Sequence, residues 1–156
     1  MKWSDVPSML LVWALITLIG VGCAEVQKPI LENASAYNSR GVTYYQKGQF
    51  DQAIKDFTKA IEIQPRYAEA YCYRGIAYHE KGQFDRAISD CNKAIEINPK
   101  LALAYNIRSR ARFFKKEYEK AWEDVNKTQE LGYQVDPKFL KDLREASGRA
   151  HGLKAH

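Results

Sequence analysis

Few side chains in this 156-residue chain could carry out chemistry, and they do not form a recognisable active site. His79, His151 and His156 are widely spread, so they do not provide the ligand cluster that a metal ion needs. The sequence contains no CxxC pair and no HExxH, P-loop or GxSxG motif, so the common routes to zinc, nucleotide and hydrolase chemistry are missing. We therefore expect a protein without catalytic activity, metal or cofactor.

Acidic residues recur in a way that indicates helix surface rather than catalysis. They include Asp51, Asp56, Asp85, Asp90 and Glu96. Two of them return after 34 residues, Asp51 as Asp85 and Asp56 as Asp90, as in a structural repeat. This recurrence predicts a solvated helix face and not a general acid and base pair.

The cysteines Cys72 and Cys91 are candidates for a disulfide. Cys91 stands where Phe57 stands 34 residues earlier, so we expect it to be a small buried hydrophobe. Cys72 follows Tyr71 and points away from the stripe that this tyrosine belongs to, which disfavours a bond to Cys91. We expect both thiols to be reduced.

The strongest charge feature is residues 108–116, with five cations and no acid. Arg108 and Arg112 share one helix face with Lys115 or Lys116, and this face could attract anionic lipid, acidic protein or nucleic acid. Acids follow directly and compensate the charge, so an ordinary solvated face is the favoured interpretation. The net charge of the chain is only +5, and we expect no nucleic acid partner.

An internal repeat sets the elements that would position these residues. Residues 44–65 align with residues 78–99, with 15 of 22 positions identical. The offset of 34 residues defines three units, 34–67, 68–101 and 102–135. The hydrophobic content of 46% is enough for a continuous core, so the composition predicts one helical domain.

Each unit is expected to contain two helices. Tyr37, Gly41 and Tyr44 lie four and three residues apart, so they form one stripe on a helix from about residue 34 to 47. Gly48 is expected to close this helix in a left-handed conformation. The stripe of the second helix consists of Ala53, Phe57 and Ala60. Pro65 ends the second helix, and the small residues let the two helices approach closely.

The third unit is degenerate. Ser109 replaces the glycine, Arg112 the second tyrosine and Thr128 the small alanine, but helical periodicity persists. Asp136-Pro137 then predicts the start of a short helix over 136–147, followed by a frayed tail over 148–156. The residues of this helix expected to cover the end of the third unit are Phe139, Leu140 and Leu143.

The N-terminus resembles a bacterial lipoprotein signal. Met9 to Ile19 is apolar apart from Thr17, and small residues precede Cys23, although Gly20 stands where the lipobox usually has Leu. This resemblance implies a signal peptide over 1–22, a lipid on Cys23 and a linker over 23–33. The protein would be anchored to a membrane of the bacterial envelope and face the periplasm, with the outer membrane favoured because Ala24 follows the cysteine. A single-pass anchor, ordinary secretion and a buried core helix are the alternatives.

The repeat units resemble the tetratricopeptide-repeat (TPR) family. The matching signature residues are Tyr37, Arg40, Gly41, Tyr44, Ala53, Phe57, Ala60 and Pro65 in the first unit, and Tyr71, Arg74, Gly75, Tyr78, Ala87, Cys91, Ala94 and Pro99 in the second. The resemblance implies an all-α fold: a right-handed α-solenoid of three helix-turn-helix units plus a C-terminal capping helix. It also implies a non-catalytic scaffold for protein–protein interaction.

In this family, ligands bind the concave surface that the first helix of each unit forms. Carried over by repeat position, this surface consists of Asn38, Val42, Tyr45, Glu69, Cys72, Tyr73, Ile76, His79, Leu103, Asn106, Ile107, Arg110 and Phe113. Its apolar and aromatic character suits an amphipathic helix or an extended apolar peptide. The alternative for each residue is packing between neighbouring units.

Chaperone-binding members of the family hold a C-terminal carboxylate with Lys, Asn and Arg side chains on this surface. The matching places carry Asn38, Val42, Tyr73, Leu103 and Ile107, so that set is absent. We therefore expect a protein or peptide partner that is not recognised by its C-terminal carboxylate. The alternatives are a structural protein that self-associates as a homo-oligomer and an accessory subunit of an envelope enzyme or assembly complex.

Overall fold

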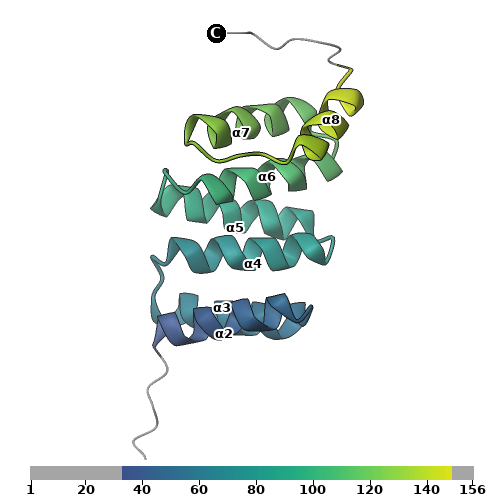
Figure 1. Ribbon diagram of the computed structural model, residues 1–156. Coiled ribbons are helices and arrows are strands. Elements are labelled where there is room, and N and C mark those ends of the chain that lie inside the picture. Colours follow the sequence, from purple (N-terminus) through teal and green to yellow (C-terminus); the bar gives the residue numbers. More distant parts are fainter. Residues whose placement is uncertain (1–32, 149–156) are drawn as a thin grey trace, which may run out of the picture. The chain divides into compact units, whose positions relative to one another are not determined.

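The computed structural model describes residues 33–148, which form seven α-helices and no strand (Figure 1). The helices are α2 (Ala34–Gln46), α3 (Phe50–Ile63), α4 (Ala68–Glu80), α5 (Phe84–Ile97), α6 (Ala102–Phe114), α7 (Tyr118–Glu130) and α8 (Pro137–Ala146). The predicted all-α fold is confirmed. The predicted signal segment, Cys23 and the end of the tail lie outside the described residues. None of the helices within residues 33–148 is long and apolar enough to cross a membrane.

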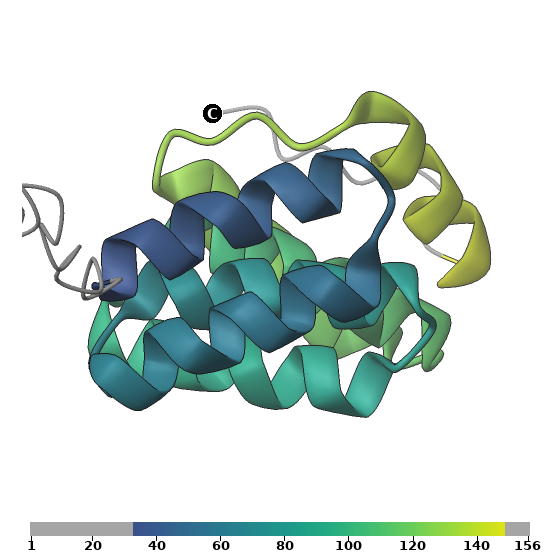
Figure 2. The same cartoon turned by 90° about the horizontal axis from the view of Figure 1, so that it is seen from below.

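Consecutive helices form the pairs α2–α3, α4–α5 and α6–α7, and the pairs stack in chain order (Figure 1). The first helices of the pairs also contact one another, α2 with α4 and α4 with α6. Figure 2 looks along the stack and shows that the connection from α7 to α8 passes on the side of α2 rather than α3. The first helices and this connection therefore share one side of the solenoid.

Local sequence explains where the helices begin and end. The side chain of Asn33 accepts a hydrogen bond from the backbone N–H of Ala36 at 2.9 Å and so caps α2. Gly48 and its equivalent Gly82 have φ angles of +72° and +70°, the left-handed conformation that glycine adopts without strain. Lys116 occupies this position in the third pair with φ +62°. The turn between the two helices of this pair therefore carries backbone strain that the glycines avoid in the other two pairs.

The core matches a small residue on the first helix of each pair to a larger one on the second. A Cβ on Gly41 would lie 2.7 Å from the Phe57 ring, so only glycine fits there. The equivalent Gly75 faces the smaller Cys91, with 3.2 Å between the added Cβ and Sγ. In the third pair, the glycine and aromatic places hold Ser109 and Val125, both fully buried. Relative to the first pair, the side chain gained at Ser109 on α6 is offset by Val125 on α7, which is smaller than Phe57.

The prediction that Asp56 and Asp90 belong to a solvated face is wrong. Their exposures are 7%, and each carboxylate accepts two hydrogen bonds from an arginine 16 residues earlier. The lengths are 2.6 and 2.9 Å from Arg40, and 2.7 and 2.8 Å from Arg74. This bidentate pair joins the two helices of each unit. By contrast, Asp51 and Asp85 are exposed, and they accept hydrogen bonds from lysines of the following unit, Lys81 and Lys115.

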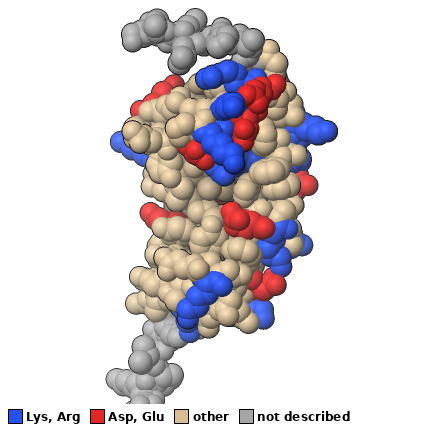
Figure 3. Space-filling view, turned by 45° about the vertical axis from the view of Figure 1, so that its right-hand side comes forward, with Lys and Arg blue, Asp and Glu red and all other residues tan. Residues whose placement is uncertain are grey.

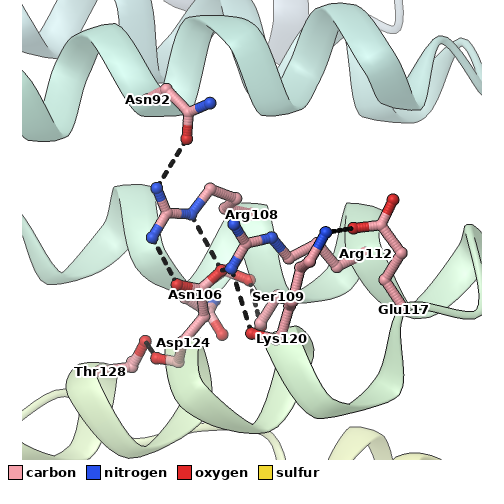
Figure 4. A network of polar contacts seen from close by, with 9 residues as sticks. All are labelled: Asn92, Asn106, Arg108, Ser109, Arg112, Glu117, Lys120, Asp124 and Thr128. Atoms are coloured by element: carbon pink, nitrogen blue, oxygen red, sulfur yellow. Dashed lines mark hydrogen bonds and ion pairs between the residues drawn. The ribbon is translucent and has the colours of Figure 1, made fainter.

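The third unit repeats this pair and enlarges it (Figure 4). Asp124 accepts hydrogen bonds from Arg108 at 2.9 and 2.6 Å, and a further one from Arg112 at 2.8 Å. Arg108 also donates to Asn92 of the preceding unit at 2.6 Å. The hydroxyl of Thr128 donates to the backbone oxygen of Asp124 at 2.7 Å. Two of the substitutions that make this unit degenerate in sequence, Arg112 and Thr128, therefore form hydrogen bonds with Asp124.

This network corrects in part the favoured expectation of a solvated face over residues 108–116, because the side chains of Arg108 and Arg112 are only 15% and 16% exposed. Arg108 and Arg112 are directed at Asp124, and Lys115 forms ion pairs with Asp85 and Glu117. On the face drawn in Figure 3, basic and acidic residues lie next to one another and form no continuous basic area. Three of the five cations of this stretch thus form internal ion pairs.

Helix α8 covers the end of the third pair. Its residues Phe139 and Leu143 are buried in one cluster with Ala121 and Val125 of α7 and with Val135 of the preceding connection. Asp136 caps α8 by accepting a hydrogen bond from the N–H of Lys138 at 2.9 Å. The helix thereby closes the apolar surface that an additional pair would otherwise cover.

Candidate functional site

The first helices of the three pairs line a groove with a volume of about 460 Å³. Its lining residues within the described part of the chain are Val42, Tyr45, Gln46, Tyr73, Ile76, His79, Glu80, Leu103, Asn106, Ile107, Arg110 and Tyr133. They come from α2, α4, α6 and the connection between α7 and α8. The groove therefore extends over all three pairs, and most of its side chains are apolar or aromatic.

Aromatic pairs at the turn end of each unit fix the side chains there. The Tyr45 ring lies 5.7 Å from the ring of Phe50, and His79 lies 5.5 Å from Phe84 at the equivalent place. These distances are typical of favourable ring contacts. Each pair joins the end of a first helix to the start of the second, so the side chains that line the groove are held by the packing of the unit.

Nine of the thirteen residues predicted for the concave surface line this groove, as the sequence placed them. The four that do not are Asn38, Glu69, Cys72 and Phe113. Cys72 is 1% exposed and packs against Ala94 and Ala104 between the units, so its assignment to the groove is corrected. Asn38, at the equivalent place on α2, is also buried, whereas Glu69 is exposed in the first turn of α4.

Phe113 does not line the groove because its side chain packs against α8 instead. Its ring lies 5.6 Å from the ring of Phe139, nearly perpendicular to it, and it packs against the cluster beneath α8. The groove gains Gln46, Glu80 and Tyr133, which the sequence did not indicate. Gln46 and Glu80 each follow a predicted lining residue directly. Tyr133 comes from the non-repeating connection, so no repeat position pointed to it.

Burial shifts the pKa values of two groove residues. The pKa of His79 is lowered by burial, and Arg110 acts in the same direction while Glu80 opposes it. The pKa of Tyr45 is raised, first by burial and then by Glu80. His79 is therefore neutral at neutral pH, and the charged side chains of the groove are Glu80 and Arg110.

Two polar atoms of the groove have no internal hydrogen-bond partner among the described residues. They are Nε2 of His79 and Oδ1 of Asn106, and both are inaccessible to solvent. Buried polar atoms are normally paired, because an unpaired one loses its hydration without compensation. These two atoms are therefore buried in the wall of the groove without a partner within residues 33–148.

Reactive groups are lacking in this part of the chain. Cys72 and Cys91 are free and buried, as expected of reduced thiols. Burial raises the pKa of the Cys72 thiol to about 12 and that of Cys91 well above its usual value, so neither provides a thiolate nucleophile. Within residues 33–148 no group of three or more His, Cys, Asp or Glu side chains could hold a metal ion.

Two models of known protein families match the repeat of this chain. The profile described as TPR repeat matches residues 41–82, and the profile described as tetratricopeptide repeat matches residues 68–101. No curated protein matches the chain.

Solved structures resemble the chain over most of its length. The first TPR of Spaghetti (RPAP3), bound to the HSP90 peptide SRMEEVD, is 30% identical with a TM-score of 0.69, and the match covers 75% of this chain and 92% of that one. The Arabidopsis OM64 TPR domain is 26% identical with a TM-score of 0.69, and coverage is 75% and 96%. TPR2B of yeast Sti1, in a complex with pHsp70, is 29% identical with a TM-score of 0.67, and coverage is 75% and 98%. The signature residues, the stacked helix pairs and these similarities together show that the chain belongs to the tetratricopeptide-repeat family.

Proposed function

We propose that this chain is a non-catalytic interaction module that binds an apolar peptide segment of a protein partner in the groove. The observation that carries the proposal is the lining itself, in which Val42, Ile76, Leu103 and Ile107 occur together with three tyrosines. A concave apolar surface with a few polar groups is the usual form of a peptide site. The peptide complexes of Spaghetti (RPAP3) and Sti1 support the proposal, because their domains have the same fold.

The manner of binding differs from that of members that grip a C-terminal carboxylate. At the places of that set the groove carries Val42, Tyr73, Leu103 and Ile107, and Asn38 is buried outside the lining. Apolar side chains cannot neutralise a carboxylate, and burying one against them would be costly. The expected ligand therefore contributes apolar side chains, as an amphipathic helix or an extended strand.

Replacing Ile76 with Ala is expected to weaken peptide binding about 10- to 30-fold, because a central apolar contact is removed. The probe is the strongest-binding peptide selected from a random 12-residue phage library against the unmodified chain, with affinity measured by fluorescence anisotropy. Ile63→Ala is the matched control, since Ile63 is 50% exposed on α3 and lies outside the groove. Equal affinities for both variants, or a library that yields no binding peptide, would refute the proposal.

We further propose that a lipid on Cys23 anchors this module to a bacterial envelope membrane. The supporting observation is the apolar stretch of residues 9–19 followed by small residues and the cysteine. Expression in a bacterial host with radioactive palmitate is expected to label the chain and place it in the membrane fraction. Cys23→Ala should remove the label. Labelling that persists in this variant, or unlabelled soluble chain from the unmodified sequence, contradicts the anchor.

A further inference from the structure

Arg110 differs from the other arginines on the first helices of the pairs. Arg40, Arg74, Arg108 and Arg112 each form an ion pair with a buried aspartate. The guanidinium of Arg110 instead lies 5.2 Å from the centre of the Phe139 ring on α8, and no carboxylate of the described residues is within ion-pair distance of it. It is the only basic side chain among the described residues that line the groove.

This contact with the ring holds a cation in place without satisfying its hydrogen-bond donors. An arginine has five N–H donors, and a cation–π contact leaves donors available to bind a carboxylate. The acidic residue of the groove, Glu80, lies 3.5 Å from Nδ1 of His79 and forms no ion pair with Arg110. The positive charge in the groove is therefore not neutralised by a direct pair from within residues 33–148.

A second observation points to a ligand at the same end of the groove. Asn106 lies four residues before Arg110 on the same face of α6, so its amide N–H groups are donors on the side of the groove that carries the guanidinium, whereas its unpaired Oδ1 is an acceptor and does not bind a carboxylate. Both side chains line the groove together with Leu103 and Ile107 of the same helix. Apolar contacts and unsatisfied polar groups thus occur side by side on α6.

We infer that the groove selects peptides that carry an Asp or Glu side chain among apolar residues, with that carboxylate bound by the guanidinium of Arg110. This inference rests on the proposed function and specifies its ligand. One cation matches one carboxylate, whereas a C-terminal acidic residue would bring two negative charges. We therefore expect the acid to be an internal side chain of the ligand rather than a C-terminal Asp or Glu.

The test uses peptides from the library selection described above, synthesised with acetylated N-termini and amidated C-termini. For each binding peptide, the acidic position is made Glu, Gln or Lys. The Glu form is expected to bind about tenfold more tightly than the Gln form, since a bidentate pair with arginine is a strong hydrogen bond. Arg110→Glu should reverse the order so that the Lys form binds best, and Arg110→Lys should keep a weaker preference for Glu.

Arg66→Glu is the matched control, because it makes the same charge change at an exposed turn residue outside the groove. It should leave the order of the three peptides unchanged, and circular dichroism should show the same helix content for every variant. If the peptides bind with equal affinity in their Glu, Gln and Lys forms while Ile76→Ala weakens them all, the inference is wrong and the proposed function stands. If free-acid peptides bind and amidated ones do not, the ligand is a terminus and the inference also fails. If no peptide binds, both are overturned.

Discussion

Replacing Asp124 with Asn is expected to lower the free energy of unfolding by about 3 kcal/mol, because it leaves two arginines without their charge partner in a buried place. The Asp124 side chain is 2% exposed, and the side chains of Arg108 and Arg112 are 15% and 16% exposed. Asparagine keeps the shape of the side chain but has only one acceptor oxygen. Urea denaturation followed by circular dichroism measures the loss.

The equivalent change in the first unit provides the control. Asp56→Asn removes the same kind of pair, but the side chain of its partner Arg40 is 41% exposed, so water replaces part of the interaction. The expected loss there is about 1 kcal/mol. Equal losses for the two variants would show that burial of the arginines does not determine the strength of these pairs.

Replacing Phe57 with Ala is expected to cost about 4 kcal/mol of stability, the range found when a buried aromatic ring leaves a cavity. Phe57 is fully buried, and its ring stacks on Tyr73 of the next unit at 5.8 Å. Cys91→Ala, at the same place in the second unit, removes only one sulfur atom and should cost about 1 kcal/mol. Thermal and urea denaturation of the two variants compare the effects directly.

Gly41 provides a further test, because the Phe57 ring fills the space that a side chain at this position would occupy. Gly41→Ala alone should destabilise the protein, since the new Cβ would meet the ring at 2.7 Å. In the Phe57→Ala background the same change should be stabilising by about 1 kcal/mol, because the space is then free and alanine favours a helix. A double-mutant cycle with no coupling between the two positions would contradict this account of the core.

The sequence was most informative where the chain repeats. The stripes of tyrosine, glycine and alanine predicted the helices, and the resemblance to the family predicted the groove positions by repeat position, because a residue at a given repeat position meets similar surroundings in every unit. The Arg–Asp pairs also recur every 34 residues, as Arg40 with Asp56 and Arg74 with Asp90. They were missed because helical periodicity describes one helix at a time, whereas these pairs connect two helices.

Contacts between segments that are distant in sequence account for the other errors. Tyr133 enters the groove from the connection between α7 and α8, whose path no repeat position predicts. Phe113 leaves the groove because Phe139 packs against it. Arg108 and Arg112 were expected on a solvated face, because the sequence alone did not reveal that they face the buried Asp124. In each case a contact with a distant segment outweighed the local pattern.

The position of Phe139 links the length of this solenoid to what it binds. The same ring closes the apolar end of the last unit and supports Arg110 at the groove. A longer protein made by inserting a fourth unit before α8 would move this ring away from Arg110 and leave that side chain in new surroundings. Gain of a repeat, in evolution or by design, would therefore change ligand preference even if no residue of the existing groove were altered.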